Sequence, residues 1–450
     1  MFKPFIWLVF FWVTGRSICA QSQPNHSGLP NIYSVEQLLA DWDFYRNKLE
    51  STHPNLNLYT SKTDLNYILD SLRNSITTPM TELDFYKHIT TISPYIGDGH
   101  SLILPSLNGT NYHNSFSKFW PLQIAYQNGV WEVIGNYMED GQVPVGANIQ
   151  SINGLPMTTI WNILISRQVR DGHNTAYAEW VLQNFFREYY SYLFGHPNEF
   201  EVTYSFSGKT AKTTVQAWSK DSLWASQQRK NLLNKENNSA ISWSMHPEQS
   251  LALLSIKTFH RQVLRHDYHQ KFKREIKHGF KTLRDAGIQH LVLDLRDNQG
   301  GDLLYGVYLL AHLLDKPFKI VQTYQRITHG ELVSTHGPCS GWHKPRKQSY
   351  TGKLDVWLNG GSFSNSVIVA SCLNQHNRVN FYGSESGGNP HVLAGHTKSL
   401  TLPHTKIRVD LPTKRFVLTS LKDNSGRGIR PNHSIKALNP SEVVKFRPAH

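Results

Sequence analysis

Hydrophobic residues recur at helical spacing in the first hundred positions of the chain. After Ser34, large apolar residues fall on one predicted helix face: Leu38, Leu39, Trp42, Tyr45 and Leu49. This spacing predicts an amphipathic helix, and Ser34 with Gln37 three residues later is the pattern of a capping box. Similar spacing predicts helices over 64–76 and 81–92. Residues 32–105 are therefore expected to form a small helical domain.

Between Trp120 and Trp218 the pattern changes to alternation, which predicts mostly strands. Asn128-Gly129, between two alternating runs, is a hairpin signal. The stretch 144–154 enters a strand that closes on an Asn-Gly turn, and residues 118–220 as a whole resemble a PDZ domain. PDZ domains capture an extended peptide or a C-terminus by strand addition. The equally open alternative is that this domain only packs against its neighbour.

From residue 241 onward, apolar strands alternate with amphipathic helices. The predicted strands are 251–256, 290–295, 319–321, 354–358 and 379–383, and the predicted helices are 272–283, 303–314 and one that begins at Ser364. This alternation implies a parallel sheet with both faces covered. Functional sites in such sheets gather at the carboxyl ends of the strands. Residues 240–440 are thus expected to form an α/β domain, and the whole chain a multidomain α/β protein.

The N-terminus has the pattern of a secretory signal peptide. Lys3 precedes the apolar run 5–13, and small residues lead to a cleavage point after Ala20. Residues 1–20 are therefore expected to be removed, 21–31 to form a linker, and the mature protein to be exported, periplasmic or extracellular. The apolar run is too short for a comfortable membrane span, so no stable membrane insertion is expected.

Composition supports a folded and exported chain. The 450 residues are 39% hydrophobic and 12% aromatic, which excludes a disordered protein. The net charge of +13 comes without a dense basic block, so nucleic-acid binding is not indicated and at most a weak preference for anionic surfaces is expected. The run 271–277 is predicted to be a solvated helix face. Export permits a disulfide, but the sequence leaves open whether Cys339 and Cys372 pair.

One stretch carries candidate chemistry between a predicted strand and a predicted helix. The turn Gly360-Gly361 is followed by Ser362, Ser364 and Ser366. The N–H groups and the dipole at a helix N-terminus favour negative charge, so a serine there can be an exposed nucleophile. The alternative is that all three serines are caps and turn residues, which is the usual role of serine before a helix.

Two other loops carry groups that such a serine would need. Its hydroxyl requires a base, and His100 follows the turn Gly97-Asp98-Gly99. The oxyanion requires preorganised N–H donors, and Gly300-Gly301 follows a buried strand, where glycine lets backbone amides approach closely. A structural or solvated histidine is the competing interpretation of His100. Asp294, at the end of that strand, is expected to be structural.

Two motifs together resemble the tail-specific, or C-terminal processing, serine peptidase family. They are the segment 291–301, which contains Gly300-Gly301, and the segment 359–366, in the order and at about the spacing of that family. The resemblance covers nearly all of the mature chain. It implies Ser364 as the nucleophile and an oxyanion hole made by the amides of Gly300 or Gly301 and of Asn365. It also implies a catalytic domain with a crotonase/ClpP-like spiral sheet.

The base is expected to be a histidine. In the Ser-Lys branch of this family the lysine lies in a glycine-rich segment that here is 383–390, and the aligned position falls on or near Asn389. The sequence instead resembles the tricorn-core-like branch, which uses serine, histidine and an acid, and Gly97-Asp98-Gly99-His100 fits its base motif. Asp423 is the first candidate for the acid and Glu385 the second, with Asp410 also considered; solvated carboxylates are the alternative.

The expected function is that of an exported serine peptidase. Ser364 would attack a peptide carbonyl of a polypeptide substrate with His100 as the base, and the substrate would enter by its C-terminus if the PDZ-like domain keeps a groove. No cofactor or metal is expected, because His391, His396 and His404 lack ligand spacing. Two rivals remain: an inert protein that binds a hydrophobic ligand on the same fold, and a peptide-binding scaffold.

Overall fold

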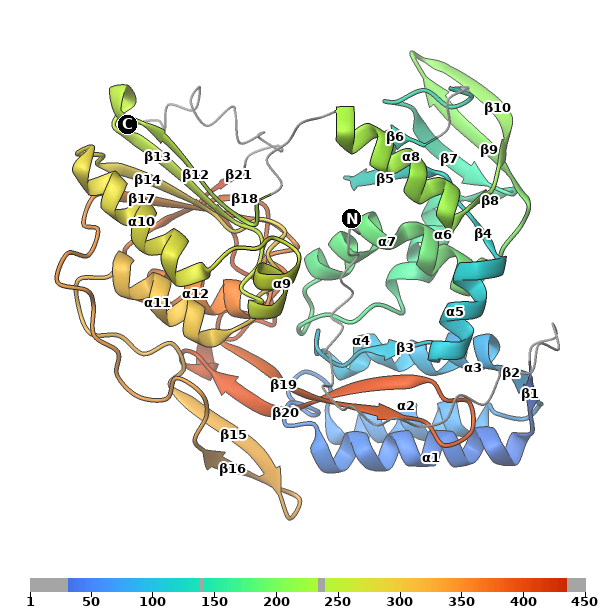
Figure 1. Cartoon of the computed structure of the whole chain (residues 1–450). Coiled ribbons are helices and arrows are strands. Elements are labelled where there is room, and N and C mark those ends of the chain that lie inside the picture. The colour runs from blue at the N-terminus through green and yellow to red at the C-terminus, as the bar shows by residue number, and fades with distance from the viewer. Residues whose placement is uncertain (1–30, 138–140, 234–238, 435–450) are drawn as a thin grey trace.

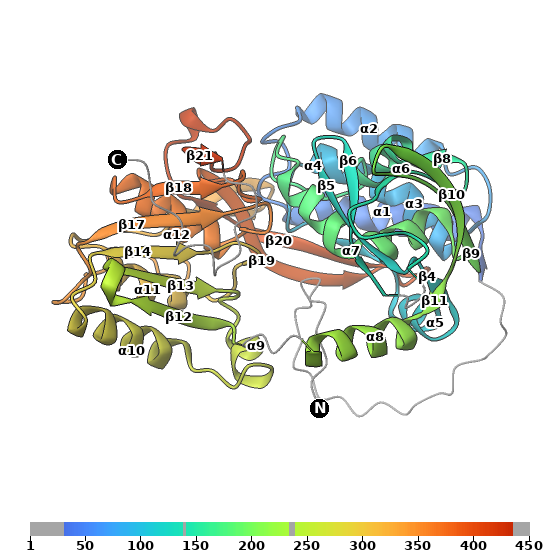
Figure 2. The same ribbon diagram turned by 90° about the horizontal axis from the view of Figure 1, so that it is seen from above.

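A computed structural model describes residues 31–137, 141–233 and 239–434. The chain forms two lobes that lie side by side, with the N-terminal helices and the β-rich segment in one and the α/β segment in the other (Figures 1 and 2). The predicted signal peptide and nearly all of the predicted linker, residues 1–30, lie outside the described residues. Over the described ranges, every helix is too short or too polar to cross a bilayer.

A helical unit opens the described chain. Its elements are β1 (Ile32–Tyr33), α1 (Val35–Thr52), α2 (Lys62–Asn74), β2 (Met80–Thr81), α3 (Glu82–Ile89), the 3-10 turn η1 (Thr90–Ile92) and α4 (Ser93–Ile96). The predicted capping box is confirmed, because Ser34 and Gln37 each bond the other's backbone N–H at the start of α1. Leu38, Trp42 and Phe85 are fully buried in the core of this unit. The apolar residues at helical spacing in the sequence therefore lie on helices and pack together as the core of this unit.

A β-rich unit follows. Its elements are β3 (Ile103–Leu104), α5 (Leu107–Phe116), β4 (Lys118–Phe119), β5 (Leu122–Gln127), β6 (Val130–Asn136), β7 (Asn148–Ile152), β8 (Leu155–Pro156), α6 (Met157–Ile165), α7 (Ala176–Phe194), β9 (Glu199–Phe206), β10 (Lys209–Gln216), β11 (Trp218–Ser219) and α8 (Lys220–Leu233). The antiparallel sheet has the order β10-β9-β7-β6-β5, and β8 pairs with β7. Asn128 and Gly129 both adopt positive φ in the predicted hairpin turn between β5 and β6.

The prediction of mostly strands between Trp120 and Trp218 is wrong for α6 and α7. The α7 segment is rich in Tyr and Phe, which favour strands, but its buried side chains recur at helical spacing. They are Tyr177, Val181, Leu182, Phe185, Phe186 and Tyr189. These side chains pack in the same core as the sheet, so burial of one helix face overrode local propensity. Whether this unit functions as a PDZ domain stays a prediction.

The second lobe is built on a mostly parallel sheet. Its strands are β12 (Ile241–His246), β13 (Leu251–Ile256), β14 (His290–Asp294), β17 (Lys353–Leu358), β18 (Asn380–Gly383) and β21 (His433–Ser434), in that order. Every neighbouring pair from β13 to β21 is parallel, and β12 is antiparallel to β13. The helices of this lobe are α9 (Arg261–His266), α10 (Phe272–Asp285), α11 (Leu303–Leu313) and α12 (Asn365–Gln375), with 3-10 turns η2 (Pro247–Gln249) and η3 (Leu421–Asp423).

The predicted alternation of strands and helices is confirmed there with one exception. Residues 319–321 form no strand, although Ile320 and Val321 are buried. These residues therefore belong to the core without being part of a sheet. Cys339 and Cys372 are both free thiols, so the two cysteines do not pair in this fold.

A second sheet joins the lobes. It has the order β16-β15-β20-β19, with β15 (Thr323–Thr328), β16 (Glu331–Thr335), β19 (Val392–Thr401) and β20 (Arg408–Val417), and β3 pairs with β20. The long β19–β20 hairpin runs from the α/β lobe to the first helices (Figure 1). Asp41 of α1, fully buried, accepts hydrogen bonds from His404 N–H at 2.7 Å and from Thr405 N–H at 2.8 Å. This hairpin therefore holds the segment that carries His100 against the α/β lobe.

Candidate active site

Ser364 occupies a strained position between β17 and α12. Its φ of 53° and ψ of −121° lie in a region that residues other than glycine seldom adopt, at a cost of about 1–3 kcal/mol. Ser364 is the N-cap residue of α12, yet its side chain makes no capping hydrogen bond. The turn thus presents the hydroxyl of Ser364 without using it to cap the helix.

His100 lies next to this hydroxyl. The distance from His100 Nε2 to Ser364 Oγ is 3.2 Å, which is within hydrogen-bond reach of a general base. The imidazole packs on Phe363 with ring centroids 4.7 Å apart. Desolvation lowers the pKa of His100 to about 4, so the ring is neutral near pH 7 and able to accept a proton. The structure therefore brings together the predicted nucleophile and the predicted base.

The other two serines of the motif hold the turn. Ser362 Oγ donates to Leu295 O at 2.8 Å and accepts from Asn359 N–H at 3.1 Å. Ser366 Oγ donates to Asn298 O at 2.6 Å. Both serines are fully buried. Their contacts tie the nucleophile turn to the loop after β14, as expected for supporting residues.

The predicted oxyanion donors do not all remain free. Gly300 N–H donates to Asn298 Oδ1 at 2.9 Å within the turn, and its part in an oxyanion hole stays a prediction. Within the described ranges, the amides of Gly301 and Asn365 have no hydrogen-bond partner. A Cβ on Gly300 would lie 2.7 Å from Asn365 N and 2.8 Å from Ser364 Cβ. The role of Gly300 is thus to let its turn approach Ser364 closely.

Asn389 stands where the related branch has its lysine. Asn389 is fully buried, and its Nδ2 donates to Tyr59 OH at 2.9 Å and to Asn424 Oδ1 at 2.7 Å. Its backbone N–H donates to Asp171 Oδ2 at 3.1 Å. The position therefore belongs to a neutral polar network rather than to a base.

The acids considered from the sequence are placed as follows. Glu385 forms an ion pair with Arg427, at 3.0 Å from Nε to Oε1, and accepts from Gly428 N–H at 2.8 Å. Asp410 accepts from Ser399 Oγ within the β19–β20 hairpin. The backbone of Asp423 ends η3, and its side chain lies outside what the structure describes. Glu385 is thus committed to a cation, and Asp423 stays a prediction.

Two carboxylates that are not among the predicted acids lie beside His100. One oxygen each of Asp98 and Asp171 and one ring nitrogen of His100 are within 4.8 Å of one another. Asp171 accepts hydrogen bonds from Gly99 N–H at 2.8 Å and from Asn389 N–H. Burial raises the pKa of both carboxyls, that of Asp98 more strongly. His100 Nδ1, on the ring side away from Nε2, is buried and has no hydrogen-bond partner in the described structure.

A local signal could have pointed to Asp171. The polar stretch Arg170-Asp171-Gly172-His173-Asn174 separates two apolar runs, which marks a loop. Because strands were predicted on both sides of it, this loop was not recognised as a candidate site. Three such ligand atoms could also hold a cation. The two backbone N–H groups that bind Asp171 favour an interaction within the protein instead, and no metal is assigned.

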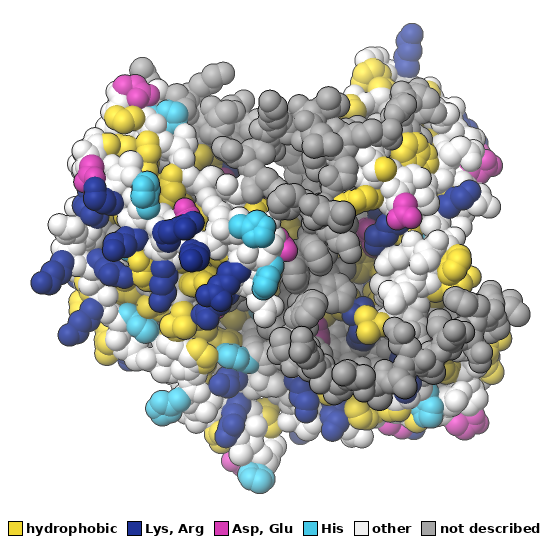
Figure 3. All heavy atoms as spheres, viewed as in Figure 1, with side chains coloured by type: hydrophobic (Ala, Val, Ile, Leu, Met, Phe, Trp, Pro, Cys, Tyr) yellow, Lys and Arg dark blue, Asp and Glu magenta, His cyan; other side chains and the backbone are white. Residues whose placement is uncertain are grey.

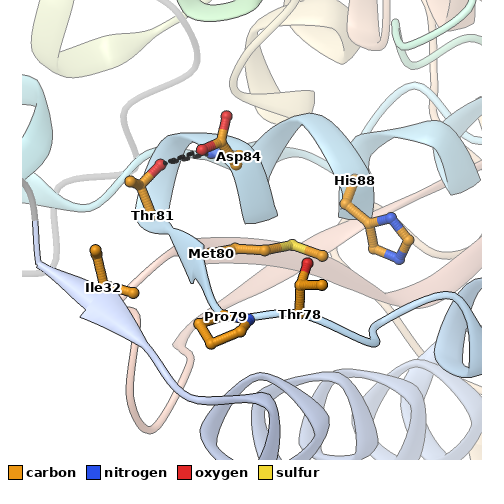
Figure 4. Close-up of a pocket in the computed structure, with 7 residues that line it drawn as sticks. All are labelled: Ile32, Thr78, Pro79, Met80, Thr81, Asp84 and His88. Carbon is orange, nitrogen blue, oxygen red and sulfur yellow. Dashed lines mark hydrogen bonds between the residues drawn. The ribbon is translucent and has the colours of Figure 1, made fainter.

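Two pockets differ in their relation to this site. An apolar pocket of about 10 Å³ lies between α7 and the loop after β14, lined by Leu102, Gln168, Val169, Tyr177, Val181, Phe185, Tyr189 and Gln299. Tyr177 also stacks on Phe363, with ring centroids 4.1 Å apart, so this pocket adjoins the Ser364 turn. A pocket of about 410 Å³ lies on the helical unit (Figure 4), where Thr81 bonds Asp84 at the start of α3; it shares no residue with the site.

Fold and site together define a class of protein: a multidomain α/β protein with a Ser–His pair at the carboxyl end of a parallel strand. The particular family follows from sequence comparison. The model of peptidase family S41 matches residues 250–435, which contain Ser364 and the sheet of the α/β lobe. The expected resemblance to the C-terminal processing peptidases is thereby confirmed.

Similar proteins agree with this placement. A probable CtpA-like serine protease of Staphylococcus epidermidis is 26% identical over 163 residues, which cover 36% of this chain and 30% of that protein. Carboxyl-terminal-processing peptidase 2, a chloroplastic protein of Arabidopsis thaliana, is 24% identical over 179 residues, which cover 40% of this chain and 32% of that protein. This chain thus spans about a third of the length of these curated relatives.

The fold extends the likeness beyond the matched segment. The structure of mature CPAF in complex with lactacystin resembles this chain with a TM-score of 0.68, over 89% of this chain and 94% of that one. The sequences are 14% identical, so this comparison concerns the fold alone. The multidomain α/β architecture predicted from the sequence is thereby confirmed at the level of the whole chain.

Proposed function

We propose that this protein is an exported serine peptidase that hydrolyses peptide bonds of polypeptides through an acyl-enzyme on Ser364. The observation that carries the proposal is the 3.2 Å distance between His100 Nε2 and Ser364 Oγ. The two residues come from different lobes and lie 264 positions apart in the chain. The match of residues 250–435 to the model of peptidase family S41 supports the same conclusion.

The geometry gives each group a role. Ser364 Oγ attacks the peptide carbonyl as its proton passes to His100 Nε2, and the resulting imidazolium returns the proton to the leaving amine. The amides of Gly301 and Asn365 receive the oxyanion, aided by the N-terminal end of the α12 dipole. Water then hydrolyses the acyl-enzyme with His100 again as the base.

We infer that Asp171 supports the protonated form of His100. Its two backbone N–H donors favour the carboxylate, whereas burial and the neighbouring charge of Asp171 raise the pKa of Asp98 more strongly. A carboxylate beside the buried Nδ1 would orient the imidazole and stabilise its charge, as the third member of a triad does. Asp423 is the competing candidate, because its loop neighbours Asn389 through Asn424.

Kinetics of three variants discriminate between these acids. Asp171→Asn should slow fluorophosphonate labelling of Ser364 and shift the acidic limb of the labelling–pH profile to lower pH, because a lost negative charge lowers the pKa of His100. Asp423→Asn and Glu385→Gln should leave that limb in place. A shift in Asp423→Asn alone would assign the acid to Asp423 instead.

The apolar pocket beside Gln299 suggests what the site accepts. Its side chains come from α7 and from Leu102, two residues after His100. At about 10 Å³ the pocket has room for about one water-sized group, so it favours a substrate with the smallest apolar side chain, that of alanine, next to the scissile bond. Entry by the C-terminus of the substrate remains part of the proposal, through the sheet of the β-rich unit if its edge accepts an extended strand.

The decisive experiment compares Ser364→Ala with wild type in fluorophosphonate labelling and in turnover of denatured casein. Both signals should vanish in Ser364→Ala, while thermal unfolding shows that the variant is folded. Ser384→Ala, an exposed serine in a nearby loop, is the matched control and should retain both signals. Undiminished labelling and turnover in Ser364→Ala would instead favour an inert binding protein on this fold.

A further inference from the structure

Positive charge is distributed unevenly along the chain. Residues 239–434 contain 26 Lys and Arg against 13 Asp and Glu, an excess equal to the formal net charge of +13 of the whole protein. The remaining residues are therefore neutral overall. The α/β lobe together with the β19–β20 hairpin therefore bears the entire positive excess, although the sequence shows no dense basic block.

Helix α10 gathers much of this charge on its outer side. Phe272, Ile276, Phe280 and Leu283 are buried against the sheet. Lys273, Lys277, Lys281 and Arg284 follow at helical spacing on the opposite side, and all four are exposed. Lys281 pairs with Asp285 at 2.6 Å. Among the described residues, no carboxylate lies within 4.0 Å of the other three, so none of the three forms an ion pair.

The positive surface continues beyond α10. Tyr308 of α11 lies under both Lys273, at 5.5 Å from cation to ring centroid, and Arg346, at 4.8 Å. Trp342 lies in the chain segment just before Arg346 and is 68% exposed. The Lys319 ammonium lies 5.0 Å from the centroid of its ring. Figure 3 shows the Lys and Arg side chains gathered over this part of the α/β lobe, with few acidic side chains between them.

We propose that this surface docks the protein on an anionic lipid bilayer. The surface, called here the basic face, consists of Lys273, Lys277, Lys281, Arg284, Arg346 and Trp342. Lysine ammonium groups on flexible stems act as mobile point charges, which suits a fluid layer of anionic headgroups better than a fixed ligand. Tryptophan favours the interface between headgroups and hydrocarbon. The apolar side of α10 is buried against the sheet and cannot enter the hydrocarbon. The helix would therefore rest on the bilayer surface without inserting.

The geometry favours a bilayer over a single-stranded nucleic acid. Proteins that bind single strands combine a basic groove with several aromatic rings for base stacking. Here the charges stand on the outer side of a helix, and Trp342 is the single exposed tryptophan of this surface in the described residues. The charge asymmetry also predicts an orientation, because the α/β lobe with the basic face would lie toward the lipid while the other lobe faces away.

Vesicle co-sedimentation of the full chain tests the proposal. The protein should sediment with vesicles of phosphatidylcholine plus phosphatidylglycerol and not with phosphatidylcholine alone, and added salt should weaken the binding. Each basic side chain near an anionic bilayer strengthens binding about fivefold. The triple variant Lys273→Gln, Lys277→Gln, Lys281→Gln should therefore bind about a hundredfold more weakly. Trp342→Ala should weaken binding further.

A matched control makes the same change in charge elsewhere. Lys48→Gln, Lys62→Gln, Lys209→Gln alters three exposed lysines of the other lobe and should bind like wild type. Equal losses in both triple variants would overturn the proposal, as would equal binding to both kinds of vesicle. Capture of the protein by heparin or single-stranded DNA without vesicle binding would assign the basic face to a soluble polyanion and reject the bilayer.

The test is independent of the peptidase chemistry. The triple lysine variant should retain fluorophosphonate labelling at the wild-type rate, which also shows that it is folded. Ser364→Ala should bind vesicles like wild type. Failure of vesicle binding with intact labelling therefore rejects the basic face alone, and failure of labelling with intact vesicle binding rejects the proposed peptidase alone.

Discussion

At the scale of single residues, three serines with the same chemistry have different surroundings. The hydroxyls of Ser362 and Ser366 donate hydrogen bonds to backbone carbonyls of the loop after β14. Ser364 has a strained backbone and a hydroxyl that faces His100. Strain of this kind persists only where neighbouring contacts overdetermine it, and the two buried serines supply those contacts. The capping interpretation therefore fails for the middle serine only.

Substitution of these serines should separate stability from chemistry. Ser362→Ala and Ser366→Ala each leave buried partners unpaired and should lower the free energy of unfolding by about 1–3 kcal/mol. Both variants should still be labelled by a fluorophosphonate below their unfolding temperatures. Ser364→Ala should lose labelling with little change in stability. Chemical denaturation and labelling of the same samples check this pattern; a variant of Ser362 that is stable but unlabelled would contradict it.

The buried carboxyl of Asp98 should leave a mark on stability. Burial raises the pKa of Asp98 from its ordinary value of 3.8 to about 8. Some carboxyls have a higher pKa in the folded protein than in the unfolded protein. Such a carboxyl contributes stability that is fully present below its pKa in the unfolded protein and is lost as the pH rises through its pKa in the folded protein. In Asp98→Asn the side chain does not titrate, and its amide oxygen can still accept from His100 N–H, as Asp98 Oδ1 does at 2.8 Å. Relative to Asp98→Asn, the wild type should therefore lose stability as the pH rises from 3.8 to about 8.

Urea denaturation of wild type and Asp98→Asn across that range checks the prediction. Asp43→Asn is the control, because Asp43 is a partly exposed member of an ion pair with Arg73 and has a lowered pKa. Its effect should have the opposite sign, with the wild type losing relative stability as the pH falls. Parallel curves for wild type and Asp98→Asn would show that Asp98 does not hold its proton in the folded protein.

At the scale of elements, the turn between β14 and α11 packs closely against Ser364. Gly300 has a φ of +95°, and a Cβ there would overlap Asn365 N and Ser364 Cβ. Gly300→Ala should displace the nucleophile turn and slow labelling of Ser364 about a hundredfold, the cost of a misplacement of about 1 Å. The labelling rate of folded protein measures this effect.

Gly287→Ala is the matched control for that substitution. Gly287 follows the end of α10 with a φ of +65° and has open space around it. A Cβ there should cost about 1–2 kcal/mol of stability through backbone strain alone and leave the labelling rate unchanged. An equal loss of labelling in both variants would show that backbone strain, rather than contact with Ser364, explains the effect.

The elements also show where local pattern was sufficient. The capping box at Ser34, the hairpin at Asn128-Gly129 and the strand–helix alternation of the second lobe were predictable because each depends on neighbours within a few residues. Helix α7 was missed because its aromatic residues favour strands locally. Only its burial between the sheet and the Ser364 turn, where Gly360 and Gly361 closely approach the helix, selects the helical state.

At the scale of the whole molecule, the site exists only when the lobes are docked. His100 belongs to the first lobe and Ser364 to the second, and the β19–β20 hairpin connects them. Asp41→Ala would leave the buried N–H groups of His404 and Thr405 without an acceptor. We expect a loss of roughly 3 kcal/mol in unfolding free energy. Labelling should slow by more than the unfolded fraction explains.

Asp43→Ala, on the same helix, is the control for the docking contact. Its ion pair with Arg73 is partly exposed, and such pairs contribute about 0–1 kcal/mol. Stability and labelling should therefore remain close to wild type. If Asp41→Ala lost stability but labelled at the wild-type rate when folded, the hairpin would stabilise the molecule without positioning His100.

By itself, the sequence determined the order of the units, most helices and strands, and the two glycine turns that mark the site. These features depend on local spacing and local sterics, which the chain carries residue by residue. Only the tertiary structure decided which serine faces His100 and that Asp171 lies beside that ring. The reason is physical: each depends on contacts between segments far apart in the chain, and those contacts exist only after the cores of both lobes have formed.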